Sequence, residues 1–158
     1  MKAQWPTAPL ALVEDDPNDA FFVRHALEEA KIANPIVAFK SADEARRECS
    51  RSPAAFEPVL FILDFHLVGE TGLDFLRWLR AQAPPLGSTP AMMLTGSDDP
   101  SHRDASRALG ALEFLQKPVT AARLATAVQA LGFVIMTGLA TGQLGARIIE
   151  RRWDASAR

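Results

Sequence analysis

The sequence predicts an α/β fold, with five parallel strands and helices on both faces of the sheet. Short apolar runs alternate with amphipathic segments along the chain, which is the pattern of repeated strand–helix–strand units. The run LFIL at 60–63 is apolar at every position, as expected for a strand that is buried on both faces. With 158 residues, of which 48% are hydrophobic, the chain can form one such domain and an appendage.

Five strands are expected from the apolar runs, in chain order. They are Leu10–Val13, Ile36–Phe39, Val59–Leu63, Ala91–Leu94 and Leu112–Leu115. Because helical segments separate these runs, the sheet should be doubly wound, with a helix crossing between successive strands.

The helices are marked by start and stop signals. Asp16 is a predicted N-cap with Pro17 at the first helical position. Asp99 and Pro100 repeat this signal before a fourth helix, which Gly110 should end. The other helices are expected at Ala42–Arg51, Leu73–Ala81 and Thr120–Leu131.

Composition excludes several classes of protein. The formal net charge of −2 provides no general attraction for nucleic acid. The single cysteine, Cys49, excludes an internal disulfide and fits a cytoplasmic protein, and the first residues do not resemble a signal peptide. The segment Leu124–Ala146 has no charged residue, but its first part has the spacing of a domain helix and the remainder is too short to cross a bilayer. We therefore expect neither nucleic acid nor membrane as a partner.

Charged and hydroxyl side chains follow the ends of four predicted strands. Because the carboxyl ends of parallel strands meet at one edge of the sheet, they should share a cleft. Carboxylates this close repel one another by about 4 kcal/mol per pair at an effective dielectric near 20, and a hard cation such as Mg²⁺ would relieve this repulsion. The residues are Glu14, Asp15 and Asp16 after the first strand, Asp64 after the third, Thr95 after the fourth and Lys117 after the fifth.

Four segments together resemble the receiver domain of two-component response regulators: EDD at 14–16, LDFHLVGETG at 63–72, LTGS at 94–97 and FLQKP at 114–118. The resemblance covers about residues 10–131. It implies a flavodoxin-like sheet with strand order 2-1-3-4-5, and a function in which an aspartate takes a phosphoryl group from a sensor histidine kinase. The protein would then signal through contact with another protein, and it would catalyse only its own phosphorylation and dephosphorylation.

Site roles also follow from the resemblance. Asp64 would be the phosphoacceptor, Asp15 and Asp64 would bind Mg²⁺ directly together with the backbone carbonyl of His66, and Glu14 would act through water. Lys117 and Thr95 would contact the phosphoryl oxygens, as their family counterparts do. Thr95 and Phe114 would form the switch, with Phe114 acting by packing alone because the chain has no tyrosine.

Some positions allow a simpler interpretation or depart from the family pattern. Asp16 could be a third metal ligand, although the N-cap role is favoured. His66 could tune the lifetime of the phosphoryl group or could face solvent, whereas His102 is expected on a helix surface. Val68 stands where the family often has proline, which predicts a looser loop after Asp64.

Other functions compete with this one. A phosphatase of the haloacid dehalogenase type would need a second aspartate two residues after the nucleophile, where this chain has His66. A receiver that never takes phosphate usually lacks some of the residues that are all present here. A phosphorelay intermediate, which passes the phosphoryl group to another histidine, remains open.

The tail at 132–158 is expected to be a helical extension of the domain, after an N-terminal tail at 1–9. Apolar residues at Phe133, Met136, Ala140, Leu144 and Ile148 follow a helical stripe. Such a stripe must be covered, either by its own domain or by a second copy, and a homodimer is the favoured alternative. The tail is too short for a DNA-binding output domain. A weaker resemblance is to stand-alone regulators paired with phytochrome-type kinases.

Overall fold

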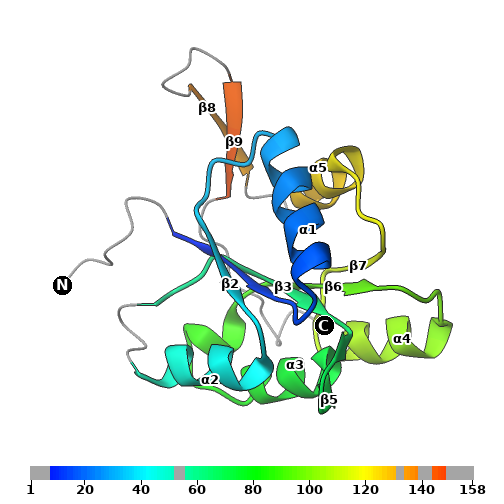
Figure 1. Ribbon diagram of the computed structural model, residues 1–158. Helices are drawn as coiled ribbons and strands as arrows, with labels where there is room; N and C mark the ends of the chain where they lie inside the picture. Colours follow the sequence, from blue (N-terminus) through cyan, green and yellow to red (C-terminus); the bar gives the residue numbers. More distant parts are fainter. Residues whose placement is uncertain (1–7, 52–55, 131–133, 139–143, 149–158) are drawn as a thin grey trace.

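The structure is a computed structural model that describes residues 8–51, 56–130, 134–138 and 144–148. Its main sheet has five parallel strands in the order β2-β1-β3-β6-β7 (Figure 1). Numbered within this sheet alone, the order is 2-1-3-4-5, so the expected fold class is confirmed. The strands are β1 (Leu10–Val13), β2 (Ile36–Phe39), β3 (Leu60–Asp64), β6 (Ala91–Thr95) and β7 (Glu113–Gln116).

Helices cover both faces of the sheet, with α1 and α5 on one side and α2 and α3 on the other (Figure 1). They are α1 (Pro17–Glu29), α2 (Ala42–Arg51), α3 (Gly72–Arg80), α4 (Pro100–Ala108) and α5 (Ala121–Ala130), and a short 3-10 helix spans Leu86–Ser88. Among the described residues, no helix has the length and apolar character needed to cross a bilayer.

Two hydrophobic cores lie on opposite faces of the sheet, and the central strands contribute to both. In β3, for example, Leu60 and Ile62 pack with residues of α1 and α5, whereas Phe61 and Leu63 pack with residues of α2 and α3. All four side chains are fully buried. This two-sided burial explains why the strand has no polar residue before Asp64, and it makes the sheet a rigid base for the strand ends.

The helix signals behave as predicted. The carboxylate of Asp16 accepts hydrogen bonds from the amides of Asn18 and Asp19, at 2.8 and 3.3 Å, so Asp16 is the N-cap of α1. Asp99 caps α4 in the same way. Gly110 follows the end of α4 with φ of 80°, a left-handed conformation that favours glycine.

The expected C-terminal helix is wrong for the two described segments of the tail. They form strands β8 (Val134–Gly138) and β9 (Leu144–Ile148), which pair antiparallel. The sequence VIMTG begins with β-branched residues that favour strands, and Gly138 and Gly145 are unfavourable within a helix. Three residues of the predicted helical stripe, Met136, Leu144 and Ile148, therefore lie in strands. The remaining tail residues lie outside the described residues.

Candidate functional site

The register of the sheet brings the predicted site residues to one edge. Val13 is level with Leu63, so Glu14 lies beside Asp64 at the ends of β1 and β3. On the other side, Asp64 is level with Leu94, and Thr95 is the last residue of β6. All these strands are buried, so the polar side chains begin where the apolar runs end.

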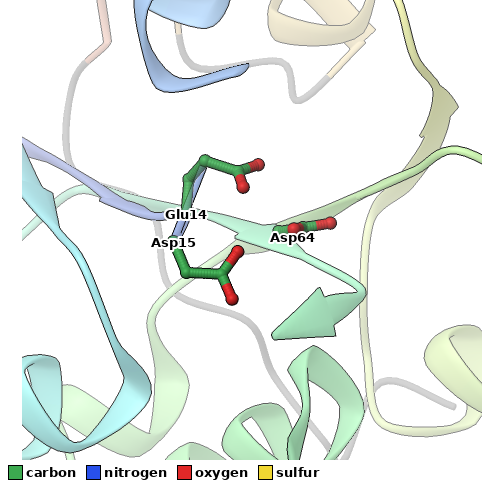
Figure 2. A group of neighbouring side chains, drawn as sticks. All are labelled: Glu14, Asp15 and Asp64. Atoms are coloured by element: carbon green, nitrogen blue, oxygen red, sulfur yellow. The ribbon is translucent and has the colours of Figure 1, made fainter. Parts of the chain in front are cut away.

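Three carboxylates gather at these strand ends. Glu14, Asp15 and Asp64 each place an oxygen within 4.8 Å of the others, and Figure 2 shows them at the adjacent ends of β1 and β3. Glu14 and Asp64 are buried, with 3% and 4% of their surface exposed, and Asp15 is half-buried. Buried carboxylates at this distance need a cation nearby.

Lys117 supplies one positive charge to this cluster from the end of β7. Its Nζ lies 2.7 Å from Glu14 Oε2, 2.8 Å from Asp19 Oδ2 and 3.2 Å from Asp64 Oδ1. The contact with Asp64 confirms that the predicted acid and ammonium groups meet. The sequence does not predict Asp19 as a site residue, because an acidic residue in the first turn of a helix is already explained by its favourable interaction with the helix dipole.

The electrostatic balance remains negative, because Lys117 contacts three carboxylates and Asp15 lies in the same acidic group. Burial raises the pKa of the Glu14 carboxyl from 4.5 to about 7, and the charge of Asp64 adds to this rise, against hydrogen bonds from Lys117 and the Asp16 amide. Burial alone would lower the pKa of Lys117, but its hydrogen bonds to Asp19 and Glu14 raise the pKa above its ordinary value of 10.5. The ammonium is therefore charged at neutral pH, whereas the raised pKa of Glu14 comes mainly from burial, with a smaller contribution from the charge of Asp64.

The loop after Asp64 forms a small hairpin, in which β4 (His66–Leu67) pairs with β5 (Glu70–Thr71). Val68 and Gly69 make the turn, and Gly69 has φ of 83°. The Val68 amide donates a hydrogen bond of 2.6 Å to Asp15 Oδ2. The loop is therefore fastened to the acidic cluster, contrary to the loosening expected from a valine at this position.

Further contacts hold the hairpin against the helices. Both terminal nitrogens of Arg46 on α2 contact the carboxylate of Glu70, at 2.8 and 2.5 Å. Gly72 lies so close to the β3 end that a Cβ there would be 2.1 Å from the backbone oxygen of Asp64. Only glycine fits so close to the backbone of Asp64. The sequence shows this glycine but does not reveal its contact with Asp64.

Thr95 and Phe114, the predicted switch residues, lie on neighbouring strands. Thr95 is fully buried, and its Oγ1 accepts a hydrogen bond of 3.1 Å from the Ser97 amide. Phe114 is half-buried, with its ring 6.4 Å from that of Phe65, the residue after Asp64. Arg103 of α4 covers the Phe114 ring at 5.7 Å. The aromatic contacts thus connect the end of β3 with β7 and α4.

Of the two histidines near the site, His102 differs from expectation, whereas His66 faces solvent, which is one of its two expected alternatives. His66 is exposed, and its amide donates to Asp64 Oδ1 at 3.2 Å. His102 was expected on a helix surface, but its ring stacks on Phe65 at 4.1 Å and is 5.9 Å from the His66 ring. Ser106 is the buried residue of α4, and its hydroxyl donates a hydrogen bond of 2.7 Å to the backbone oxygen of His102. Cys49 is buried, and burial raises the pKa of its thiol to about 12, so it is a packing residue.

The donor set fits a hard divalent cation. Its side-chain ligand atoms are all carboxylate oxygens, which Mg²⁺ prefers, and no cysteine or imidazole ligand accompanies them in the acidic group found among the described residues. A cluster of carboxylates with one shared lysine retains a negative charge that such a cation would neutralise.

The chain matches known proteins over most of this domain. Residues 10–129 match the model of the response regulator receiver domain. Among solved structures, the bacteriophytochrome response regulator RtBRR is similar with a TM-score of 0.74 and 28% identity, covering 87% of this chain and 84% of that one. The bacteriophytochrome response regulator AtBRR has a TM-score of 0.69 and 30% identity, covering 80% of this chain and 93% of that one.

A curated relative matches over a shorter stretch. The sensory/regulatory protein RpfC of Xanthomonas campestris pv. campestris is 42% identical over 64 residues, which are 40% of this chain and 9% of that protein. The match is thus to a small part of RpfC.

Proposed function

Since the chain belongs to the response regulator receiver domain family, we propose that it accepts a phosphoryl group from a sensor histidine kinase on Asp64. The observation that carries this proposal is the contact of Lys117 Nζ with Asp64 Oδ1, within a group of three carboxylates at adjacent strand ends. We place this reaction in the cytoplasm. The protein then signals through contact with another protein, and its chemistry is confined to gaining and losing its own phosphoryl group.

Mg²⁺ is the proposed cofactor. Asp15 and Asp64 would hold it directly with the backbone carbonyl of His66, and Glu14 would act through a bound water. When bound, the ion neutralises charge on the transferring phosphoryl group. The cluster offers carboxylate oxygens within 4.8 Å of one another, which supports this assignment.

In the proposed transfer, the Asp64 carboxylate attacks the phosphorus of a phosphohistidine. An O–P bond forms to Asp64 as the P–N bond to the imidazole breaks, and the electron pair of that bond remains on the imidazole nitrogen. Lys117 and the His66 amide both contact Oδ1, at 3.2 Å each, so we assign Oδ2 as the attacking oxygen. Lys117 is already in place to compensate phosphoryl charge, which makes the site preorganised.

Thr95 and Phe114 are proposed to transmit the change. The Thr95 hydroxyl would turn toward the phosphoryl oxygens and give up its bond with the Ser97 amide. This movement would leave space into which the Phe114 ring can repack. Phe114 has no hydroxyl, so the signal depends on the position of its ring.

The test is phosphorylation of the full chain by acetyl phosphate with Mg²⁺, followed by intact mass. We expect one phosphoryl adduct, which Asp64→Asn and chelation of the metal both abolish. Asp104→Asn, which changes an exposed aspartate of α4, is the matched control and should keep the adduct. An adduct that persists in Asp64→Asn would refute the assignment.

The partner kinase is proposed to be of the phytochrome type, because both solved neighbours described above are bacteriophytochrome response regulators. Phosphotransfer from a phytochrome-type kinase should be faster than transfer from an unrelated histidine kinase at equal concentrations. Equal rates from both kinases would contradict the proposal.

A homodimer through the tail, which we delimit as 132–158 after a receiver domain at 10–131, is also proposed. The pair β8–β9 has only two strands, and an isolated two-stranded ribbon is marginally stable in water. A second copy could cover it. Light scattering should give a dimer for the full chain and a monomer for a chain ending at Leu131, and monomers in both cases would exclude this arrangement.

A further inference from the structure

Arg46 on α2 forms an ion pair with a residue outside its own helix. Both of its terminal nitrogens contact the carboxylate of Glu70, which lies 24 residues later, in the hairpin β4–β5. Only 23% of each of these two side chains is exposed. Asp43, one turn earlier on α2, also contacts Arg46, but 79% of the Asp43 side chain is exposed. The pair with Glu70 is therefore the shielded one, and a two-nitrogen contact to a carboxylate fixes orientation as well as distance.

Two aromatic rings of α3 support the guanidinium of Arg46. Its central carbon lies 5.6 Å from the ring centre of Phe75 and 5.7 Å from that of Trp78. Phe75 is fully buried, and its ring packs against Phe61 of β3 at 5.7 Å. The helices α2 and α3 lie on the same side of the main sheet as β5 (Figure 1). Arg46 therefore connects the hairpin to the packed core, which an exposed salt bridge would not do.

The hairpin carries two groups that belong to the candidate metal site. At its turn, the Val68 amide donates to Asp15 Oδ2 at 2.6 Å. Its first residue is His66, whose backbone carbonyl is a proposed ligand. Thr71 lies opposite His66, but the Thr71 amide donates to Asp74 Oδ2 at 3.0 Å. The amide opposite the His66 carbonyl is thus engaged elsewhere, which suits a carbonyl that has to bind an ion.

The two ends of the hairpin are attached in different ways. At its base, the Gly72 amide donates to the backbone oxygen of Phe65 at 2.7 Å. Near its turn, Leu67 packs partly buried against the core, and Glu70 lies opposite Leu67. Each strand has two residues, and so short a pair is marginally stable without outside contacts. The ion pair of Glu70 is therefore a charged anchor for the turn end.

We propose that Arg46 is a positioning residue of the metal site, which holds the β4–β5 hairpin through Glu70 and so keeps the His66 carbonyl in place for the ion. The inference rests on the proposed function, because it concerns the Mg²⁺ ion assigned there. Without the ion pair, the carbonyl has to be ordered each time an ion binds, and this loss of freedom lowers the affinity. Removing a residue that orients a metal ligand typically weakens metal binding by about 10- to 100-fold.

The sign of the effect separates positioning from simple charge. Arg46→Met removes a positive charge and keeps an unbranched side chain beside the rings. Coulomb attraction alone would then make the site bind a cation more tightly, whereas loss of positioning makes it bind more weakly. The Val68 amide acts differently, because it occupies an oxygen of Asp15. Its loss alone releases that oxygen and leaves the His66 carbonyl in place.

Calorimetric titration of the full chain with Mg²⁺ measures the affinity. Arg46→Met should bind Mg²⁺ about tenfold more weakly than the wild type. The same loss is expected for Arg46→Met with Glu70→Gln, which preserves the net charge and leaves no unpaired carboxylate at position 70. Recovery of the affinity in this double variant would trace the loss to the unpaired Glu70 and would overturn the proposal.

The matched control is Arg51→Met, which breaks the pair of Arg51 with Glu48 on the same helix. It makes the same change of net charge and should bind Mg²⁺ as the wild type does. Equal or tighter binding by Arg46→Met, or an equal loss in Arg51→Met, would overturn the proposal. Urea unfolding verifies that each variant is folded.

Hydrogen exchange in the metal-free protein measures the hairpin directly. The Val68 amide should exchange several-fold faster in Arg46→Met than in the wild type, because the turn end opens more often. An unchanged rate would show that Arg46 does not hold the hairpin and would overturn the proposal. If Arg46→Met does not fold, Arg46→Lys replaces it, since lysine keeps the charge but lacks the planar fork. Weaker Mg²⁺ binding is again expected, and binding equal to the wild type would again overturn the proposal.

The two proposals can fail separately. If the wild type binds no Mg²⁺, the proposed cofactor fails, and the role of Arg46 fails with it. If the wild type binds Mg²⁺ and gains one phosphoryl group, but Arg46→Met binds Mg²⁺ equally well, the role of Arg46 alone fails.

Discussion

Metal-free protein should lose stability as the pH rises from 5 to 8, because Glu14 is buried among other carboxylates. Its pKa is raised from 4.5 to about 7 in the folded chain. Over this window the folded state therefore binds more protons than the unfolded state, and the free energy of unfolding falls with increasing pH. Lys117 does not oppose this trend, because a lysine with a raised pKa loses its contribution only at pH above 10.5.

The size of the effect follows from the same values. The rise from 4.5 to about 7 in the pKa of Glu14 corresponds, at about 1.4 kcal/mol per pH unit, to an upper limit of about 3 to 4 kcal/mol. Glu14→Gln carries no charge in either state, so it should lack this part of the pH dependence. Mg²⁺ at about 100 times its dissociation constant should return about 2.7 kcal/mol to the wild type at pH 8.

Urea unfolding followed by tryptophan fluorescence at pH 5, 6, 7 and 8, with a chelator present, measures these free energies. The comparison of wild type with Glu14→Gln removes the contributions of all other titrating groups. Identical pH dependence in the two proteins would refute the reasoning, as would a wild type that becomes more stable between pH 5 and 8.

Five further substitutions, two of them controls, examine the loop after Asp64 and the N-cap of α1. Gly72→Ala should lower the free energy of unfolding by about 3 kcal/mol and slow phosphorylation, because the new Cβ would lie 2.1 Å from a backbone oxygen. Its control is Gly69→Ala, where space is open but φ is 83°. This change should lower the free energy of unfolding, measured in urea, by only about 1 kcal/mol. Asp16→Ala should lower the free energy of unfolding by about 1 kcal/mol, because the N-cap of α1 is lost. Calorimetry should show an unchanged affinity for Mg²⁺. A lower affinity would show that Asp16 is a metal ligand. Val68→Pro should bind Mg²⁺ several-fold more tightly, because proline lacks the amide that donates to Asp15 Oδ2 and so leaves this oxygen available. Val68→Ala keeps the amide and should bind Mg²⁺ as the wild type does.

The five strands and their helices could be predicted from the sequence because burial on both faces leaves a local record. The central strands β1, β3 and β6 are short apolar runs that end at Glu14, Asp64 and Thr95, whereas the edge strand β7 has only two apolar residues between Glu113 and Gln116. The positions of Asp64 and Lys117 could be deduced in the same way, since strand ends in a parallel sheet meet whatever the loops do.

Contacts made by side chains across the fold left no such record. Asp19 reaches Lys117 from α1, and His102 reaches Phe65 from α4, at positions where a helix-surface role was sufficient explanation. The prediction of a helix in the tail was wrong for a different reason. An apolar residue at every third or fourth position fits a helix. Of these residues, Met136, Leu144 and Ile148 instead lie in β8 and β9, which pair with each other.

Asp19 gives Lys117 a partner before any phosphoryl group arrives. The ammonium lies 2.8 Å from Asp19 and 2.7 Å from Glu14, but 40% of the Asp19 side chain is exposed, against 1% for Glu14. Water can therefore replace the lysine at Asp19, whereas breaking the buried contact would leave Glu14 without its cation. We infer that Lys117 turns toward a phosphoryl group on Asp64 by releasing Asp19 and keeping Glu14. The partly exposed Asp19 thus holds the ammonium in position at little cost, and the strand end would be ready for the proposed transfer.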